Sequence, residues 1–193
     1  MRPIHLIYLL FIGVLIIACN DKPVVVENKT SSPQEPLVKR GEYLAHISGC
    51  IHCHTPKMMT PMGPIPDTSR LLAGYISNAT QNPISEDAFS KGWLLYNMEG
   101  TSLATPMFTS YSANITSDET GIGNWSYENF KTAITKGKYK GIPTGRDLLP
   151  PMPWQDFQHF KEDDIQAIYA FLKSTKPVRN IVPEAIINMP KEK

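Results

Sequence analysis

Four apolar residues near the end of the chain predict its clearest helix. Their spacing places all four side chains on one helix face: Ile165, Ile168, Tyr169 and Leu172. The acidic run at residues 162–164 suits the positive N-terminal end of such a helix, and Pro177 prevents its continuation. The pattern therefore predicts a helix over residues 162–174.

Two further segments predict helices that are followed by glycine. The first covers residues 37–48 and is followed by Gly49. Its apolar stripe consists of Tyr43, Leu44 and Ile47. The second covers residues 127–136, where Ser126 is suited to cap the N-terminus and Gly137 to end the helix.

Most of the remaining chain predicts loops. It carries 17 prolines and 12 glycines, which limit the number of long helices. A weaker pattern over residues 86–96 predicts one more helix, and no internal repeat is present. About 150 residues follow position 37, which is enough for one domain with a single core.

The N-terminal segment has the pattern of an export signal. Residues 4–18 are apolar and follow Arg2, but about 15 residues are too few to span a bilayer as a helix. Residues 16–19, Ile-Ile-Ala-Cys, resemble the lipobox of bacterial lipoproteins, in which the cysteine is lipidated. We therefore expect lipid on Cys19; an ordinary cleaved signal and an uncleaved anchor are the alternatives.

This interpretation divides the chain into three parts. Residues 1–18 are the signal peptide, residues 19–36 are a polar, lipidated tether, and residues 37–193 form the folded domain. Loss of the signal peptide leaves 18 basic and 18 acidic side chains. This balance gives no indication of a nucleic-acid partner.

The strongest chemical signal is the run Cys50-Ile51-His52-Cys53-His54, a C-x-x-C-H motif. Two thiols at this spacing form thioether bonds to a c-type haem, and the histidine that follows is the proximal iron ligand. Cys50, Cys53 and His54 are therefore the candidate residues for one covalently bound haem c. Export fits this interpretation, because bacteria attach c-type haem outside the cytoplasmic membrane.

Two other chemistries use paired cysteines. A structural zinc site needs a second Cys or His pair at matching spacing, and no cysteine follows Cys53. A thioredoxin-like redox pair needs a βαβ context, which the pattern does not predict. Haem attachment remains the favoured interpretation. It also accounts for the odd number of cysteines, since Cys19 has a separate role.

Four blocks of the chain resemble class I cytochromes c, in the branch found as haem subunits or partners of periplasmic dehydrogenases. The blocks are residues 40–44, 113–125, 149–154 and 164–172. The resemblance implies an all-α cytochrome c fold in which a few helices wrap around one covalently bound haem. It also implies that the first and last helices cross near the haem, where we expect Tyr43 and Phe171.

Met152 is the candidate for the second axial ligand. Prolines on both sides stiffen its loop: Pro150, Pro151 and Pro153. Stiffness matters because a thioether is a weak iron ligand that must be presented in place. The family that the chain resembles places its ligand methionine in this motif. His159 and Met107 are the reserve candidates.

The segment between the haem motif and Met152 is longer than in minimal members of that family. The excess lies mainly in residues 55–125, which we expect to form a loop-rich insertion over the haem edge that shapes the partner-docking face. A loop with no partner role is the alternative. Candidate partners for the haem propionates are Arg70, Asn114, Arg146 and Trp154.

The expected function is electron transfer and not catalysis. Histidine and methionine together leave no iron position open for oxygen or peroxide. The expected partners are a periplasmic dehydrogenase or respiratory donor and a cytochrome or oxidase acceptor, with the chain anchored by lipid on the periplasmic side of a bacterial membrane. A haem peroxidase or oxidase, and a haem-based redox or gas sensor, are the alternatives in which Met152 is labile or absent from iron.

Overall fold

The computed structural model describes residues 34–77 and 86–188. The predicted signal peptide, Cys19 and the first part of the predicted tether lie outside these residues. Of the helices within them, none combines the length and apolar character that a bilayer crossing requires.

Two of the predicted helices have the bounds that the sequence indicated: α4 (Tyr127–Lys136) and α6 (Glu162–Ser174). The first helix, α1 (Gln34–Ile47), begins three residues earlier than predicted, and the fourth, α3 (Glu86–Ser90), is shorter than predicted. The remaining helical segments are short: α2 (Cys50–His54), α5 (Trp154–Phe157), η1 (Thr68–Arg70) and η2 (Tyr139–Gly141).

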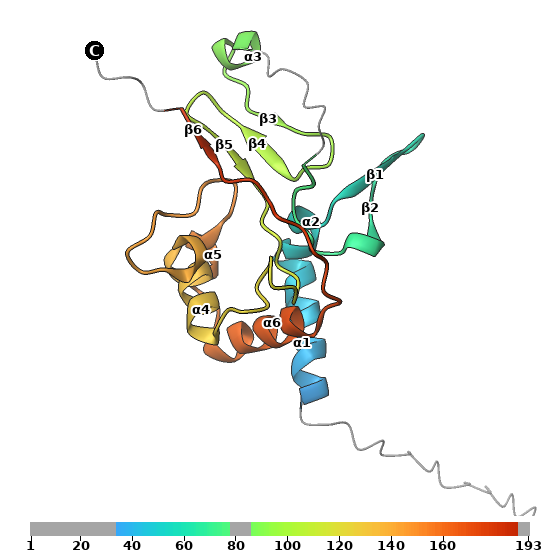
Figure 1. Cartoon of the computed structure of the whole chain (residues 1–193), viewed down its shortest axis with the longest axis vertical. Helices are drawn as coiled ribbons and strands as arrows, with labels where there is room; N and C mark the ends of the chain where they lie inside the picture. Colours follow the sequence, from blue (N-terminus) through green and yellow to red (C-terminus); the bar gives the residue numbers. More distant parts are fainter. Residues whose placement is uncertain (1–33, 78–85, 189–193) are drawn as a thin grey trace, which may run out of the picture. The chain divides into compact units, whose positions relative to one another are not determined.

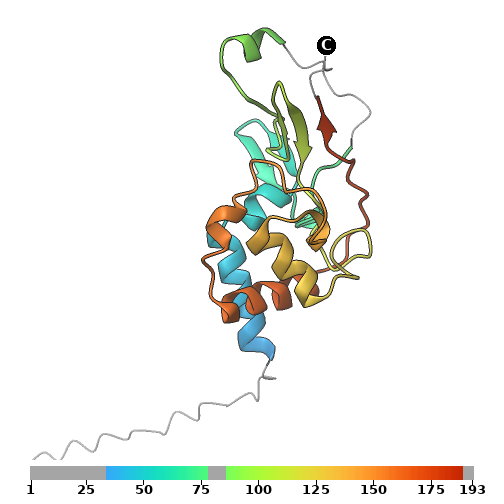
Figure 2. The same cartoon turned by 90° about the vertical axis from the view of Figure 1, so that its left-hand side faces the viewer.

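The first and last helices pack closely against each other, as Figures 1 and 2 show. The contact forms at Gly41, where a Cβ atom would overlap the carbonyl of Ala167 and approach Phe171. Phe171 is buried there, as predicted. The prediction for Tyr43 is wrong, because its side chain is 61% exposed and the buried face of α1 consists of Gly41, Leu44 and Ala45.

Two antiparallel sheets form mainly within the segment predicted to be loop-rich, and one strand of the second sheet comes from the C-terminal segment. The first pairs β1 (Lys57–Thr60) with β2 (Gly63–Pro66). The second has the order β3-β4-β5-β6 and lies apart from the α1–α6 pair in both views (Figures 1 and 2). Its strands are β3 (Leu95–Tyr96), β4 (Ser102–Ala104), β5 (Phe108–Tyr111) and β6 (Ile186–Ile187).

The prediction of an all-α fold is therefore wrong, because the described chain combines helices with two β-sheets. The strands are only two to four residues long, too short for an alternating pattern to distinguish them from loops. One pairing also joins distant segments, since Thr109 in β5 lies opposite Ile186 in β6. No local pattern predicts such a pairing.

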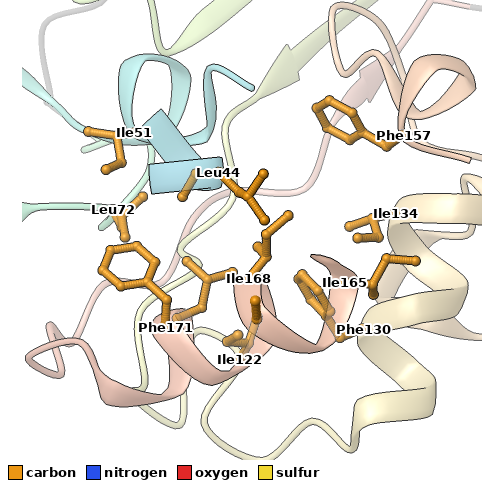
Figure 3. Packing of buried hydrophobic residues seen from close by; sticks show 13 residues of the cluster. Leu44, Ile51, Leu72, Ile122, Phe130, Ile134, Phe157, Ile165, Ile168 and Phe171 are labelled. Carbon is orange, nitrogen blue, oxygen red and sulfur yellow. The ribbon is translucent and has the colours of Figure 1, made fainter. Parts of the chain in front are cut away.

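The hydrophobic core lies among the helices, where residues from distant segments converge (Figure 3). α6 contributes Ile165, Ile168 and Phe171, and α4 contributes Phe130 and Ile134. Burial of such side chains gives about 25 cal/mol for each Å² of apolar surface removed from water. The core therefore fixes the helices that surround the cavity described next.

Candidate functional site

The C-x-x-C-H motif forms its own short helix, α2, set at an angle to α1 by Gly49. Gly49 has φ +81° and ψ 2°, in the left-handed region that favours glycine. Its carbonyl accepts a hydrogen bond from the Cys53 amide at 3.0 Å, so that the new helix begins directly after the turn. Cys50, Cys53 and His54 all line one cavity.

His54 is held in one orientation and one protonation state. It is buried, and its Nδ1 donates a hydrogen bond to the carbonyl oxygen of Ala113 at 2.7 Å. Burial lowers the pKa of His54, which the bond to Ala113 only partly opposes. The imidazole is therefore neutral, with Nε2 left to bind a metal.

The Ala113 carbonyl is in turn held by its neighbours. The Asn114 side chain accepts a bond from the Thr116 amide at 3.0 Å and donates to Val178 O at 2.8 Å. The amide of Tyr75 donates to Ser112 O at 2.8 Å. The segment that orients His54 is thus fixed against both an upstream loop and the C-terminal segment.

Met152 lines the same cavity as His54 and is partly buried against the core. Its loop is fixed on one side by Ser110 of β5, whose hydroxyl donates to Pro150 O at 2.7 Å. On the other side, the Trp154 amide donates to Met152 O at 3.0 Å, at the entry to α5. The structure thus places the candidate second ligand at the cavity. The hydrogen bond from Ser110, a residue of the insertion, helps to hold its loop there.

The reserve candidates lie elsewhere. Met107 is 66% exposed in the turn between β4 and β5, and His159 is exposed after α5. In the described part of the chain, neither residue lines the cavity.

The cavity has a volume of about 300 Å³ and is largely apolar. Its walls include side chains from the core and the loops around it: Ile122, Trp125, Phe130, Ala133, Ile134, Leu148, Phe157, Phe160, Ile168 and Leu172. Such a lining excludes water and suits a large flat hydrophobic group. Burial also raises the pKa of the Cys50 thiol, so that it is protonated at neutral pH.

The insertion forms one wall of this cavity. Residues 100–103 around β4 and residues 110–113 at the end of β5 line it, together with Tyr96. The insertion thus contributes to the cavity, while its place over a haem edge and its role in partner docking stay predictions. The supports that it provides, the Ser110 hydroxyl and the Ala113 carbonyl, carried no recognisable signal in the sequence.

Of the four candidate propionate partners, Arg146 lines the cavity. Its guanidinium lies 3.7 Å from the centre of the Tyr139 ring, and Tyr139 donates a hydrogen bond to Glu184 at 2.9 Å. Arg70 instead pairs with Asp67 at 2.6 Å. Asn114 bonds to backbone groups, and the Trp154 ring packs against Gly137. These three are not among the described residues that line the cavity.

The residues present fit a covalently attached haem. Two thiols three positions apart, a neutral imidazole and a thioether share an apolar cavity, which is the donor set of a His/Met-ligated c-type haem. Over residues 34–77 and 86–188, no group of three or more His, Cys, Asp or Glu side chains is gathered as a zinc site requires.

No protein-family model matches the chain. Its relatives include the cytochrome c subunit of a quinone-dependent alcohol dehydrogenase from Gluconobacter oxydans (strain 621H), 36% identical over 146 residues, which are 75% of this chain and 23% of the relative. The gluconate 2-dehydrogenase cytochrome c subunit of Pantoea cypripedii is 32% identical over 158 residues, 81% of this chain and 27% of the relative.

A third relative, the fructose dehydrogenase cytochrome subunit of Gluconobacter japonicus, is 26% identical over 178 residues, 91% of this chain and 29% of the relative. The chain thus spans about a quarter of the length of these curated relatives. These three homologues are cytochrome subunits of dehydrogenases, as the resemblance of the four sequence blocks indicated.

Proposed function

We propose that this chain is a membrane-anchored c-type cytochrome that carries single electrons from a periplasmic dehydrogenase or respiratory donor to a downstream acceptor. One haem c is attached to Cys50 and Cys53, with His54 as the proximal ligand and Met152 as the distal ligand. Cys19 carries the lipid that holds the protein at the membrane.

One observation carries this proposal. The two cysteines, the histidine and the methionine come from segments about a hundred residues apart, yet all four line one apolar cavity. The names of the relatives give independent support, since each is a cytochrome subunit of a dehydrogenase.

The bound haem would supply a one-electron couple. His54 contributes a neutral nitrogen, because burial lowers its pKa and Ala113 holds the proton on Nδ1. Met152 contributes a soft thioether, which favours the reduced metal and raises the potential relative to a second histidine. The apolar wall excludes water, and this too favours the less charged reduced state.

The partners follow from the relatives. Because these are subunits of alcohol, gluconate and fructose dehydrogenases, the proposed donor is a dehydrogenase that oxidises a small organic substrate. A cytochrome or an oxidase is the proposed acceptor. A lipid on Cys19 would keep the chain beside such membrane-associated partners.

The haem assignment is tested on full-length protein from a bacterial host that attaches c-type haem. We expect the red colour to remain with the protein in acidic acetone, and to be absent or extractable in the Cys50→Ala/Cys53→Ala variant. The Cys19→Ser variant is the matched control and keeps covalent haem. A colourless wild-type protein would refute the proposal.

A redox-titrated spectrum separates a carrier from a haem enzyme or sensor. A carrier with two axial ligands gives a low-spin ferric spectrum and does not bind carbon monoxide rapidly in the ferrous state. A high-spin ferric spectrum or rapid carbon monoxide binding would favour a peroxidase, an oxidase or a gas sensor. It would argue against Met152 as a stable ligand.

The membrane anchor is tested separately. Intact mass spectrometry of the wild-type protein is expected to show a lipidated N-terminus at Cys19, and detergent phase separation is expected to place the protein in the detergent phase. The Cys19→Ser variant should move to the aqueous phase. A wild-type protein whose mass shows no lipid on Cys19 would refute lipid anchoring without affecting the haem assignment.

A further inference from the structure

Lys57 is a buried lysine beside the haem motif, with only 8% of its surface exposed. Lysines are almost never fully buried unless they are paired. Its Nζ donates hydrogen bonds to three backbone carbonyl oxygens: His52 O at 2.8 Å, Thr55 O at 3.2 Å and Glu99 O at 2.6 Å. The side chain thus joins the C-terminal end of α2 to the turn between β3 and β4.

The three acceptors determine the charge of this group. An ammonium ion has three N–H donors and no acceptor, so that each donor has one carbonyl partner here. A neutral amine would direct its lone pair at one of these oxygens. Burial lowers the pKa of Lys57 from its ordinary 10.5, while the negative charge of Glu99 opposes that shift. The geometry therefore requires a charged lysine.

The elements that Lys57 joins are both parts of the cavity wall. Cys53 lines the cavity from α2, and Gly100 and Thr101 line it from the turn and β4. A Cβ atom on Gly100 would lie 3.6 Å from Lys57 Nζ. Glu99 carries a buried carboxylate oxygen, Oε2, that has no hydrogen-bond partner within the described structure.

We propose that Lys57 is a positioning residue of the haem site that fixes the β3–β4 turn against α2 and places a permanent positive charge on the Cys53 side of the cavity. The inference rests on the proposed function. A fixed cation destabilises the more positive oxidised state of a nearby metal centre relative to the reduced state. Lys57 therefore raises the reduction potential, and Glu99 lowers it.

The test is a spectroscopic redox titration of the full-length holoprotein. Lys57→Met keeps the length of the side chain and removes the charge and its donors. We expect it to lower the equilibrium constant for reduction about tenfold, which a one-electron couple reports as about 59 mV. Lys57→Arg keeps the charge and should retain most of the wild-type potential.

Two further variants separate the charge from packing. Glu99→Gln removes a negative charge and should shift the potential in the opposite direction, which a purely structural role would not produce. Lys91→Met is the matched control, because Lys91 is exposed and pairs with Asp87 at 2.6 Å, and it should leave the potential unchanged.

A Lys57→Met protein with the wild-type potential would overturn the inference while leaving the proposed function intact. If the Lys57→Met protein does not acquire covalent haem, the reduction potential of Glu99→Gln is the deciding measurement. A potential above that of the wild type supports the inference, and an unchanged or lower potential overturns it. Absence of covalent haem from the wild-type protein would overturn the proposed function, and this inference with it.

Discussion

His54 and Met152 differ in how firmly the chain holds them. His54 is part of a helix, is buried and has a short hydrogen bond to Ala113. Met152 lies in a loop that depends on one side-chain hydrogen bond, from Ser110 to Pro150, and on the turn into α5. A thioether is also a weaker iron ligand than an imidazole. We therefore expect a single substitution to free the iron position proposed for Met152 more readily than the one proposed for His54.

Met152→Ala tests directly whether Met152 is the distal iron ligand. We expect loss of the thioether-to-Fe(III) charge-transfer band, a lower reduction potential and carbon monoxide binding to the ferrous protein, because the distal position is no longer filled. The visible spectrum and a redox titration measure these changes. Met107→Ala is the control, since Met107 is exposed, and its spectrum should match the wild type. An unchanged spectrum of Met152→Ala would disprove the ligand assignment.

At the scale of elements, the α1–α6 crossing depends on the absence of a side chain. A Cβ atom at position 41 would overlap the Ala167 carbonyl, and backbone cannot move aside as a flexible side chain can. We expect Gly41→Ala to lower the free energy of unfolding by about 1–3 kcal/mol or more. Chemical denaturation measures this loss.

Tyr43→Ala is the matched control on the same helix. Tyr43 is 61% exposed, so that its loss should change the free energy of unfolding by no more than about 0.5 kcal/mol. If Tyr43→Ala lowered the free energy of unfolding more than Gly41→Ala does, the two helices would cross at Tyr43, as predicted from the sequence, and not at Gly41.

Asp67 links the end of the first hairpin to η1. Hydrogen bonds from Ser69, and one from Arg70 at 2.6 Å, hold the pKa of this carboxyl below its ordinary 3.8. Because its pKa is lower in the folded state, its stabilising effect is fully present above pH 3.8 and is lost as the pH falls through the folded value.

Asp67→Asn should therefore lower the melting temperature at neutral pH, and its difference from the wild type should shrink below pH 3.8. Thermal unfolding across a pH series measures both effects. Asp147→Asn changes an exposed carboxylate paired with Lys138 and serves as the control. If the difference in melting temperature between Asp67→Asn and the wild type stays constant at pH values below 3.8, Asp67 does not act through its charge.

At the scale of the whole molecule, Asn180 connects the C-terminal segment to the loops around His54. Its side-chain amide donates to Ala73 O at 2.7 Å and to Tyr75 O at 2.9 Å, and its backbone amide donates to Thr120 Oγ1 at 3.0 Å. Ala73 is fully buried, so that its carbonyl would have no water to replace this donor.

Asn180→Ala should cost about 1–3 kcal/mol of folding free energy, because it leaves a buried carbonyl without its side-chain donor. Denaturant unfolding of the holoprotein measures the loss. The exposed residue Asn124 provides the control, and Asn124→Ala should unfold at the wild-type midpoint. If the wild type, Asn180→Ala and Asn124→Ala unfold at the same denaturant concentration, Asn180 of the C-terminal segment does not stabilise the loops around His54.

The cations of residues 131–146 form ion pairs with more than one segment of the chain. Five cations fall within residues 131–146, yet Lys131 pairs with Glu162 at 2.8 Å and Lys140 with Glu184 at 3.4 Å. Glu184 also lies 3.7 Å from Arg146. Glu162 comes from α6 and Glu184 from the C-terminal segment, so that these ion pairs form only after folding, whereas Lys138 pairs with its near neighbour Asp147.

The sequence alone determined the bounds of α4 and α6, because helix periodicity, caps and terminating glycine or proline act within a few residues. It also identified the C-x-x-C-H motif and the candidate methionine, whose signals are local. Tertiary structure alone decided the two sheets, the close approach at Gly41, the Ala113 carbonyl on His54 and the burial of Lys57. Most of these features depend on groups far apart in the chain, such as β5 with β6 and Gly41 with Ala167, and the strands of the local hairpins are too short to carry a recognisable pattern.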